Sequence, residues 1–373
     1  MTEENDPDWA SSRKSFILIF NVGRGLAIFI RTSINQGFIY DLGSSEGFSP
    51  LEFLEENIIP YLDKYIAADG KESNIAQRII SHPHADHFTD IGNLFDDDDD
   101  EKDIFYAGLH TCPHDKAGSD EMLDWNRMTN SGKSDALIEK YKLLYFGRNL
   151  PLQAIMYKGK WFEQTEYGIY YVKPPIVDEI CPDNDQDYSN GLSIVLYYKH
   201  GNHSILIPGD ITPDVFNYLL DEEEGVEKRY TKFSKSFHVN HPDWHLKNSD
   251  QPSLKQLLQD HGLSILLAPH HGLESGFLDY LYEQLGERKP GLVVVSEKRH
   301  TDEGDGEVDP IYSSEEGSIG QNVYIDGEKS DSYSISTRNG HHILIIFDGS
   351  AKKPLVYLEK EAEDLIKRMD ENA

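Results

Sequence analysis

The stretch that decides the fold is "RIISHPHADHFTDIGNLF", residues 78–95. An apolar run of strand type ends directly in four residues of metal-binding type, His82, His84, Asp86 and His87, and an apolar, helix-like pattern follows. In an extended loop alternate residues point the same way, so the first three project to one side and His87 turns to another. This geometry suits two neighbouring metal ions better than one.

The ligand types indicate a catalytic rather than a structural metal site. Imidazole and carboxylate groups suit zinc, manganese or iron, and the absence of thiolates argues against a closed structural zinc site. Even with 16 histidines in the chain, a chance match to this spacing is rare. A functional metal centre is therefore the preferred interpretation, with a surface histidine cluster as the alternative.

Two later strand-like runs also end in ligand types. Asp210 follows a glycine in "ILIPGD", and "LLAPHHG" delivers His270 and His271. In α/β folds, strands that end at one edge of a sheet build the binding site there. Taken singly, Asp210 also fits a helix N-cap in "GDITPD", and His271 also fits a packing or ligand-supporting histidine. The order of the three clusters favours a shared site.

Strands and helices alternate along the chain. Two strands flank "NVGRG" within residues 15–32, a third covers residues 37–43, and Ser49 and Pro50 begin a helix over residues 49–66. Residues 96–165 and 221–258 are more polar and are predicted to be insertions. This pattern favours an α/β protein with αββα layers. We expect a flexible N-terminus over residues 1–14, one domain over 15–350 and a C-terminal helix over 351–373.

The composition is that of a folded protein, with 38% hydrophobic residues and a net charge of −31. Such a charge repels bare nucleic acid and anionic membranes at long range. We read no signal peptide, and the apolar run at residues 343–347 is too short for a bilayer, so we expect a cytoplasmic protein without a membrane part.

The chain holds two cysteines, Cys112 and Cys181, which we expect to be reduced thiols. Cys112 stands between His110 and His114, and a metal-chelating loop there is the alternative interpretation.

The ordered clusters "HPHADH", "PGD" and "PHHG" resemble those of the metallo-β-lactamase fold superfamily. Within it, the pattern is similar to the metallo-hydrolase domain of the ComEC/Rec2 competence proteins. Further stretches that resemble this group are "FNVGRGLAIFI" (20–30), "YDLGS" (40–44), "SNGLSIVLYYKHGNHSILIPGD" (189–210), "LLAPHHGLESG" (266–276) and the closing "SYSISTRNGHHILI" (332–345). The resemblance covers residues 15 to about 300 apart from the two insertions, and it implies an αββα sandwich. Because ComEC proteins are membrane channels, this chain resembles a free-standing relative.

The resemblance implies one or two divalent ions, zinc or manganese, and a metal-activated hydroxide that attacks phosphorus or a carbonyl. His82 and His84 would hold one ion. The second would be held by Asp86, His87 and His270, with Asp210 bridging both. Asp86 would also orient the nucleophile. His271 would support a ligand or donate a proton.

The chain also departs from the resembled pattern. Many hydrolases of the superfamily have a further histidine where this chain offers "DYSNGLS", with Asn190 and Ser193. The half of the site held by the first two histidines is therefore expected to bind its metal more weakly. Asn21 and Leu26 stand where the ComEC-like group usually has acidic residues. The stretch at residues 296–300, "SEKRH", keeps only part of that group's substrate-side pattern.

Three histidines lie in the second predicted insertion, between Asp210 and His270. We hypothesise that this segment covers the site and lends a substrate contact, and a solvent-facing loop is the alternative. The three are His238, His241 and His245.

These observations leave three functions open. The first is a phosphodiesterase or nuclease acting on nucleic acid or a nucleotide, which the resemblance favours and the net charge opposes. Residues 139–150 mix basic and aromatic side chains, and this pattern indicates either a contact with nucleic acid or a plain amphipathic helix. The second is a hydrolase of carbon esters, thioesters or lactones. The third is a non-catalytic sensor or interaction protein that docks a partner on its acidic insertions.

Overall fold

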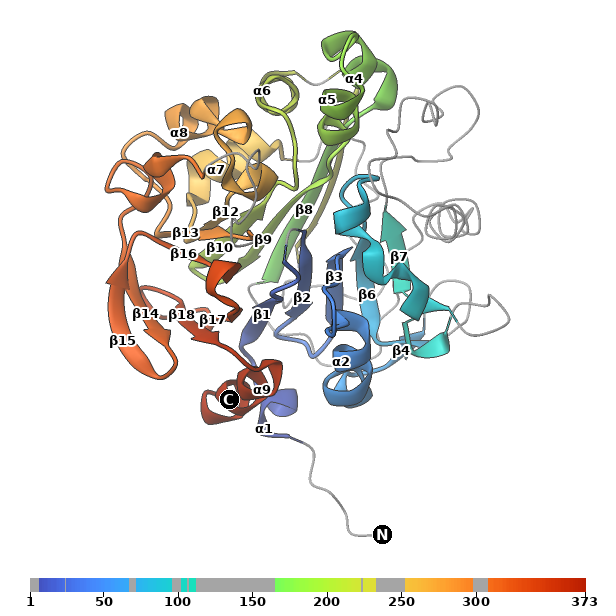
Figure 1. Cartoon of the computed structure of the whole chain (residues 1–373), viewed down its shortest axis with the longest axis vertical. Coiled ribbons are helices and arrows are strands. Elements are labelled where there is room, and N and C mark those ends of the chain that lie inside the picture. The colour runs from blue at the N-terminus through green and yellow to red at the C-terminus, as the bar shows by residue number, and fades with distance from the viewer. Residues whose placement is uncertain are drawn as a thin grey trace.

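The computed structural model describes residues 7–23, 25–66, 72–95, 102–105, 107–111, 165–222, 224–232, 252–297 and 308–373. Two large mixed β-sheets occupy the centre, and helices lie on their outer sides (Figure 1). This arrangement confirms the predicted α/β class. None of the helices within the described ranges is both long enough and apolar enough to cross a membrane.

One sheet has nine strands. In spatial order they are β15 (Glu328–Ser332), β14 (Gln321–Ile325), β18 (Leu355–Glu359), β17 (His342–Phe347), β1 (Ser15–Ile19), β2 (Ala27–Arg31), β3 (Gly37–Leu42), β6 (Ile75–Ile79) and β7 (Ala107–Thr111). β17, β1, β2 and β3 pair antiparallel, whereas β3, β6 and β7 run parallel and so end at one edge. A separate ribbon joins β4 (Tyr65–Ile66) to β5 (Glu72–Ser73).

The other sheet has seven strands. In spatial order they are β11 (Val226–Lys232), β8 (Thr165–Val172), β9 (Val195–His200), β10 (His203–Ile207), β12 (Ile265–Leu267), β13 (Leu292–Val295) and β16 (Ser334–Ser336). β10, β12, β13 and β16 are parallel to one another. The carboxyl ends of these four strands therefore share one edge of the sheet.

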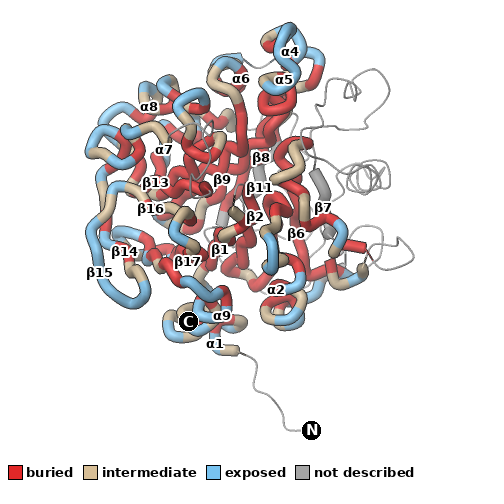
Figure 2. The backbone as a smooth tube through the Cα atoms, in the orientation of Figure 1, coloured by how far each residue is buried: buried red, intermediate tan, exposed pale blue. Residues whose placement is uncertain are grey.

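The two sheets face each other across an apolar core. Alternate residues of β1 point to opposite faces of the sheet. Ile17 and Ile19 belong to the cluster between the sheets, whereas Phe16 and Leu18 belong to the cluster on the side of the helices. Both faces are covered, which is why the strand is buried throughout and every residue after Ser15 is apolar (Figure 2). Direct contacts join the sheets, since the Phe38 and Tyr167 rings lie 4.8 Å apart and the Tyr40 hydroxyl donates to the Ile194 carbonyl at 2.6 Å.

Helices cover the outer faces. The predicted start of α2 (Pro50–Asn57) is confirmed, because the Ser49 hydroxyl accepts a hydrogen bond from the Glu52 amide and Pro50 opens the helix. Within the described ranges, the other α-helices are α1 (Asp8–Ser11), α4 (Pro174–Ile180), α5 (Asp185–Gly191), α6 (Pro213–Asp221), α7 (Leu254–His261), α8 (Asp279–Leu285) and α9 (Ala362–Glu371). In Figure 1, α2 and α9 lie beside the nine-stranded sheet, and α6 to α8 lie beside the other.

The N-terminal segment differs from the prediction. Residues 1–6 lie outside the described ranges, but α1 (Asp8–Ser11) packs on the body, and Trp9 is fully buried. The Trp9 amide donates to the Asp370 carboxylate of α9, and its ring meets the Tyr61 ring edge-on. The buried guanidinium of Arg31 also donates to three backbone carbonyls of this segment. Residues 7–14 are thus part of the folded domain.

Three other predicted segments, the two insertions and the C-terminal helix, each contain a strand of one of the sheets. β7 falls within the first predicted insertion and pairs with β6, and β11 falls within the second and pairs with β8 along its length. Within residues 351–373, predicted to be one helix, β18 pairs with β17, and the helix α9 begins only after it. β7 and β11 are edge strands of their sheets. Edge strands carry polar residues, so the hydrophobic pattern did not reveal them.

Candidate metal centre

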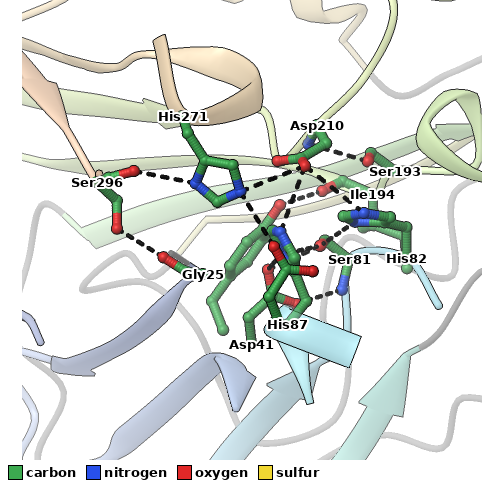
Figure 3. A network of polar contacts seen from close by, with 12 residues as sticks. Gly25, Asp41, Ser81, His82, His87, Ser193, Ile194, Asp210, His271 and Ser296 are labelled. Atoms are coloured by element: carbon green, nitrogen blue, oxygen red, sulfur yellow. Dashed lines mark hydrogen bonds and ion pairs between the residues drawn. The ribbon is translucent and has the colours of Figure 1, made fainter. Parts of the chain in front are cut away.

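The candidate centre lies where strands from both sheets end. β6 leads into His82 and His84 and then into a short 3₁₀ turn, η2 (Ala85–His87). From the other sheet, β10 leads to Asp210 and β12 leads to the turn η7 (Pro269–Gly272), which carries His271. Figure 3 shows His82, His87, Asp210 and His271 pointing toward one another.

Two groups of side chains have the composition and spacing of metal sites. The His82 group contains His82, His84 and Asp210, and the His87 group contains Asp86, His87 and His271; within each group the candidate ligand atoms all lie within 4.8 Å of one another. Asp210 stands between the groups, because its Oδ2 is 3.7 Å from the His82 Nε2, 3.4 Å from the His87 Nε2 and 3.6 Å from the His271 Nε2.

The composition of the His87 group differs from the predicted ligand set in one residue. The resemblance placed His270 with the second metal, whereas in the described part of the chain the group contains His271 and not His270. His270 and His271 both have left-handed backbone angles, with φ of 47° and 56°. Such angles cost about 1–3 kcal/mol each in a non-glycine residue and concentrate at functional sites. The turn buries His271 and leaves His270 partly exposed.

Each buried imidazole is held through its Nδ1. The His87 Nδ1 lies 2.7 Å from the Asp41 Oδ2, and the His271 Nδ1 donates to the Ser296 carbonyl at 2.9 Å. The His82 Nδ1 lies 3.0 Å from the Ser81 hydroxyl, which itself donates to Asp41 at 2.7 Å. With the Nδ1 proton donated, the lone pair of each Nε2 is left for a metal.

The three Nε2 atoms need a partner. The Nε2 atoms of His82, His87 and His271 are buried and have no hydrogen-bond partner among the described residues. Their distances of 3.4 to 3.7 Å from Asp210 are longer than hydrogen bonds. Ligands at about 2.0–2.1 Å from one tetrahedral ion lie roughly 3.3–3.4 Å apart. The donor set therefore fits divalent metal ions.

The electrostatics of the centre favour bound cations. Burial lowers the pKa of His87, but the carboxylates of Asp210 and Asp41 outweigh it and raise the pKa well above the ordinary value. His271 behaves in the same way, because Asp210 and Asp86 raise its pKa. Burial raises the pKa of Asp210, yet the surrounding imidazoles hold it well below the ordinary value. Without metal, the raised pKa values favour protonated imidazoles at His87 and His271, and a bound metal ion would replace those protons.

Asp41, to which the sequence analysis assigned no role, contacts the residues of the candidate centre. It is buried with a φ of 58°, and it accepts from the Ser81 amide at 2.6 Å, the Ser81 hydroxyl and His87. A carboxylate near the end of the apolar strand "GFIYDL" was the available signal, because a buried acid needs charged or hydrogen-bonding partners.

Two glycines let the chain close over η2. A Cβ added to Gly25 would lie 2.3 Å from the Asp86 carbonyl oxygen, and one added to Gly43 would lie 2.5 Å from the same atom. The same loop holds Asn21 and Leu26, the two residues that differ from the resembled pattern. Leu26 is buried between the sheets, and its amide donates to the Asp86 carbonyl oxygen. The Asn21 amide donates to the Nδ1 of His342 in β17. Asn21 and Leu26 thus have structural contacts here.

The segment without the expected histidine is buried and partly structural. The Ser193 hydroxyl accepts from the Asp210 amide at 3.1 Å and so fixes the backbone of that ligand. Asn190 belongs to α5 and is 1% exposed, and its Oδ1 has no hydrogen-bond partner among the residues that the structure describes. Neither side chain supplies an imidazole.

Several predicted residues lie outside the described residues. They are Cys112, His114, residues 139–150, the side chain of His110, and the insertion histidines His238, His241 and His245. Cys181 is buried and forms no disulfide with another described residue. No family model matches the sequence, and a comparison with curated proteins found no match. The centre is therefore interpreted from its geometry.

Proposed function

We propose that this chain is a metal-dependent hydrolase with the αββα fold of the metallo-β-lactamase superfamily, similar to the metallo-hydrolase domain of ComEC/Rec2 proteins. Two facing sheets with helices outside are compatible with that fold. The centre at the strand ends agrees with the order of the sequence motifs. Its substrate is proposed to be a phosphodiester, in a nucleic acid or a nucleotide.

One observation carries the proposal. The Asp210 carboxylate faces three buried Nε2 atoms that lack a hydrogen-bond partner in the described part of the chain, and these atoms belong to two adjacent ligand groups. In this proposal the His82 group holds one divalent ion, the His87 group holds another, and Asp210 contributes to both. When bound, such ions acidify a water molecule and offset the negative charge that develops on phosphate oxygens.

The chain's own residues have separable tasks in this proposal. Asp86 is the most exposed of the site's carboxylates, with 31% of its side chain accessible, and its Oδ2 lies 3.5 Å from the His271 Nε2. In this proposal Asp86 would orient the attacking water and accept its proton. Asp41 and Ser81 hold the imidazoles of His87 and His82 in the required tautomer.

The test measures turnover by the full-length protein loaded with zinc or with manganese. The substrates are a bis-aryl phosphodiester, single- and double-stranded DNA, an aryl carboxylic ester and a lactone. We expect phosphodiester cleavage that Asp210→Ala abolishes. Cleavage of the ester or lactone alone would replace the substrate class, and full metal occupancy with no turnover of any substrate would favour a non-catalytic role.

A further inference from the structure

The edge that carries the candidate metal centre also carries a basic side chain. β10, β12, β13 and β16 are parallel neighbours, so the loops that leave their carboxyl ends lie at the same edge. The loop after β10 holds Asp210, and the loop after β12 holds His271. The residues after β13 are Ser296 and Glu297, and those after β16 are Thr337 and Arg338.

Glu297 is a buried carboxylate outside both metal groups. Its side chain is 7% exposed and its Oε1 accepts from the Ser336 hydroxyl at 2.7 Å. The Glu297 amide donates to the Thr337 hydroxyl at 3.1 Å, and that hydroxyl donates to the Glu297 carbonyl at 3.2 Å. These bonds fix the carboxylate against the end of β16. A fixed buried acid requires a function or a partner.

This acid forms an ion pair with Arg338. The Glu297 Oε2 lies 3.4 Å from the Arg338 Nε, and the Arg338 amide donates to the Ser336 hydroxyl at 2.9 Å. The Arg338 side chain is 39% exposed, and it makes no other side-chain hydrogen bond or ion pair within the described ranges. Arg31, by contrast, is fully buried and bonded to three backbone carbonyls. The Arg338 guanidinium is therefore anchored at its Nε and accessible from solvent.

A direct link joins this pair to the metal centre. Ser296, which precedes Glu297, accepts the Nδ1 hydrogen bond of His271 and donates through its hydroxyl to the Gly25 carbonyl (Figure 3). β16 is two strands from β12, and neighbouring strands lie about 4.8 Å apart. The end of β16 is thus roughly 10 Å from the turn that carries His271. An arginine side chain and one phosphate group together span that distance.

We propose that Arg338 binds a phosphate oxygen of the substrate and that Glu297 is its positioning residue, an inference that rests on the proposed function. A guanidinium is charged at every physiological pH, and its planar fork matches phosphate oxygens in pairs. The proposal explains how a chain with a net charge of −31 holds an anionic substrate beside its metal ions. It assigns the site to phosphodiesters rather than to neutral esters.

The test compares Arg338→Gln with the wild-type protein and with Lys353→Gln. Lys353 is a solvent-exposed cation that donates to the Gly320 carbonyl, so it controls for the loss of one charge. With metal content equal, Arg338→Gln should raise the KM for a bis-aryl phosphodiester about tenfold to hundredfold, the range of charge-assisted hydrogen bonds, with a small change in kcat.

Two further variants separate binding from a structural role. Arg338→Lys keeps the charge without the fork and should recover part of the affinity. Glu297→Gln should raise the KM in the same direction, because the guanidinium loses its anchor. An unchanged KM in Arg338→Gln overturns the proposal. A fall in kcat and metal content at constant KM overturns it as well, because that pattern marks a purely structural residue.

A binding measurement separates this inference from the proposed function. Calorimetry with adenosine monophosphate and metal-loaded protein requires no turnover. If the wild type hydrolyses no phosphodiester, the proposed function fails, and binding that is weaker in Arg338→Gln than in Lys353→Gln still supports Arg338 as a phosphate ligand. Equal binding in both variants, or no binding by the wild type, overturns the inference.

Discussion

Asp41→Asn tests how the candidate centre holds its imidazoles. Asp41 has a φ of 58°, a conformation that asparagine tolerates well, so the backbone should keep its course. The Oδ1 atom can still accept from the Ser81 amide. The other oxygen, which faces the Ser81 hydroxyl and the His87 Nδ1, becomes an amide group that only donates. His87 must then accept at Nδ1, and its proton moves to the Nε2 that should bind metal.

The magnitude depends on that tautomer change. Loss of a partner that orients a metal-bound histidine typically lowers metal affinity by about 10- to 100-fold, or roughly 1.4 to 2.7 kcal/mol. Asp41 supports His87 directly and His82 through Ser81. We therefore expect an effect near the upper end of this range for zinc.

The assay is competition for zinc against a chelator of known affinity, with circular dichroism to verify the fold. Asp90→Asn is the matched control. Asp90 is also a buried carboxylate, but it accepts from the Ser49 hydroxyl and the Leu51 amide at the start of α2 and belongs to neither metal group. The Asp90→Asn substitution should lower the free energy of unfolding and leave the zinc affinity unchanged. A folded Asp41→Asn protein with wild-type zinc affinity would refute the reasoning.

Proton competition, N-terminal packing and loop closure can each be tested separately. Neighbouring carboxylates raise the pKa values of His87 and His271, so protons compete with metal for these imidazoles, and the affinity for metal should rise with pH from about 6 to 8. Calorimetry of metal binding in buffers of different ionisation enthalpy should detect the released protons. Identical heats of binding in all buffers would contradict this. Trp9→Ala should lower the free energy of unfolding by about 3–5 kcal/mol in denaturant titrations, whereas a flexible N-terminus predicts no change. Gly25→Ala should weaken zinc binding more than Gly23→Ala, since both have positive φ but only Gly25 would place a Cβ 2.3 Å from a backbone oxygen of η2; equal effects would assign the loss to backbone strain alone.

The parts of the fold that the sequence predicted are encoded locally. β1, β2 and β3 are dominated by apolar residues, and the start of α2 is marked by Ser49 and Pro50. The proximity of Asp210 to His271 could be expected from a general property of sheets, namely that ligands at the ends of neighbouring parallel strands share an edge. His82 follows a strand of the other sheet, so its approach to Asp210 depends on how the two sheets pack.

The choice between His270 and His271 depends on contacts that no local pattern encodes. The two are adjacent and chemically identical, and a left-handed turn directs one of them to the metal groups. The hydrogen bond that holds His271 comes from Ser296, at the end of a different strand. Such a partner becomes visible only after the strands are assembled.

The packed N-terminus shows the same limit. Trp9 is a single aromatic residue in a polar stretch, so periodicity gives no sign of its burial. Its amide bonds to Asp370, 361 residues away. A contact of that sequence separation is fixed by the tertiary fold.

The central claim is that the His82 and His87 groups hold divalent metal. The most direct measurement is metal content per chain, by elemental analysis after loading with zinc or manganese and dialysis, for the wild type and Asp210→Ala. We predict between one and two ions per wild-type chain, and a substantial loss in Asp210→Ala because that side chain belongs to one group and faces both. A metal content near zero in the folded wild-type protein, or an unchanged content in Asp210→Ala, would contradict the claim.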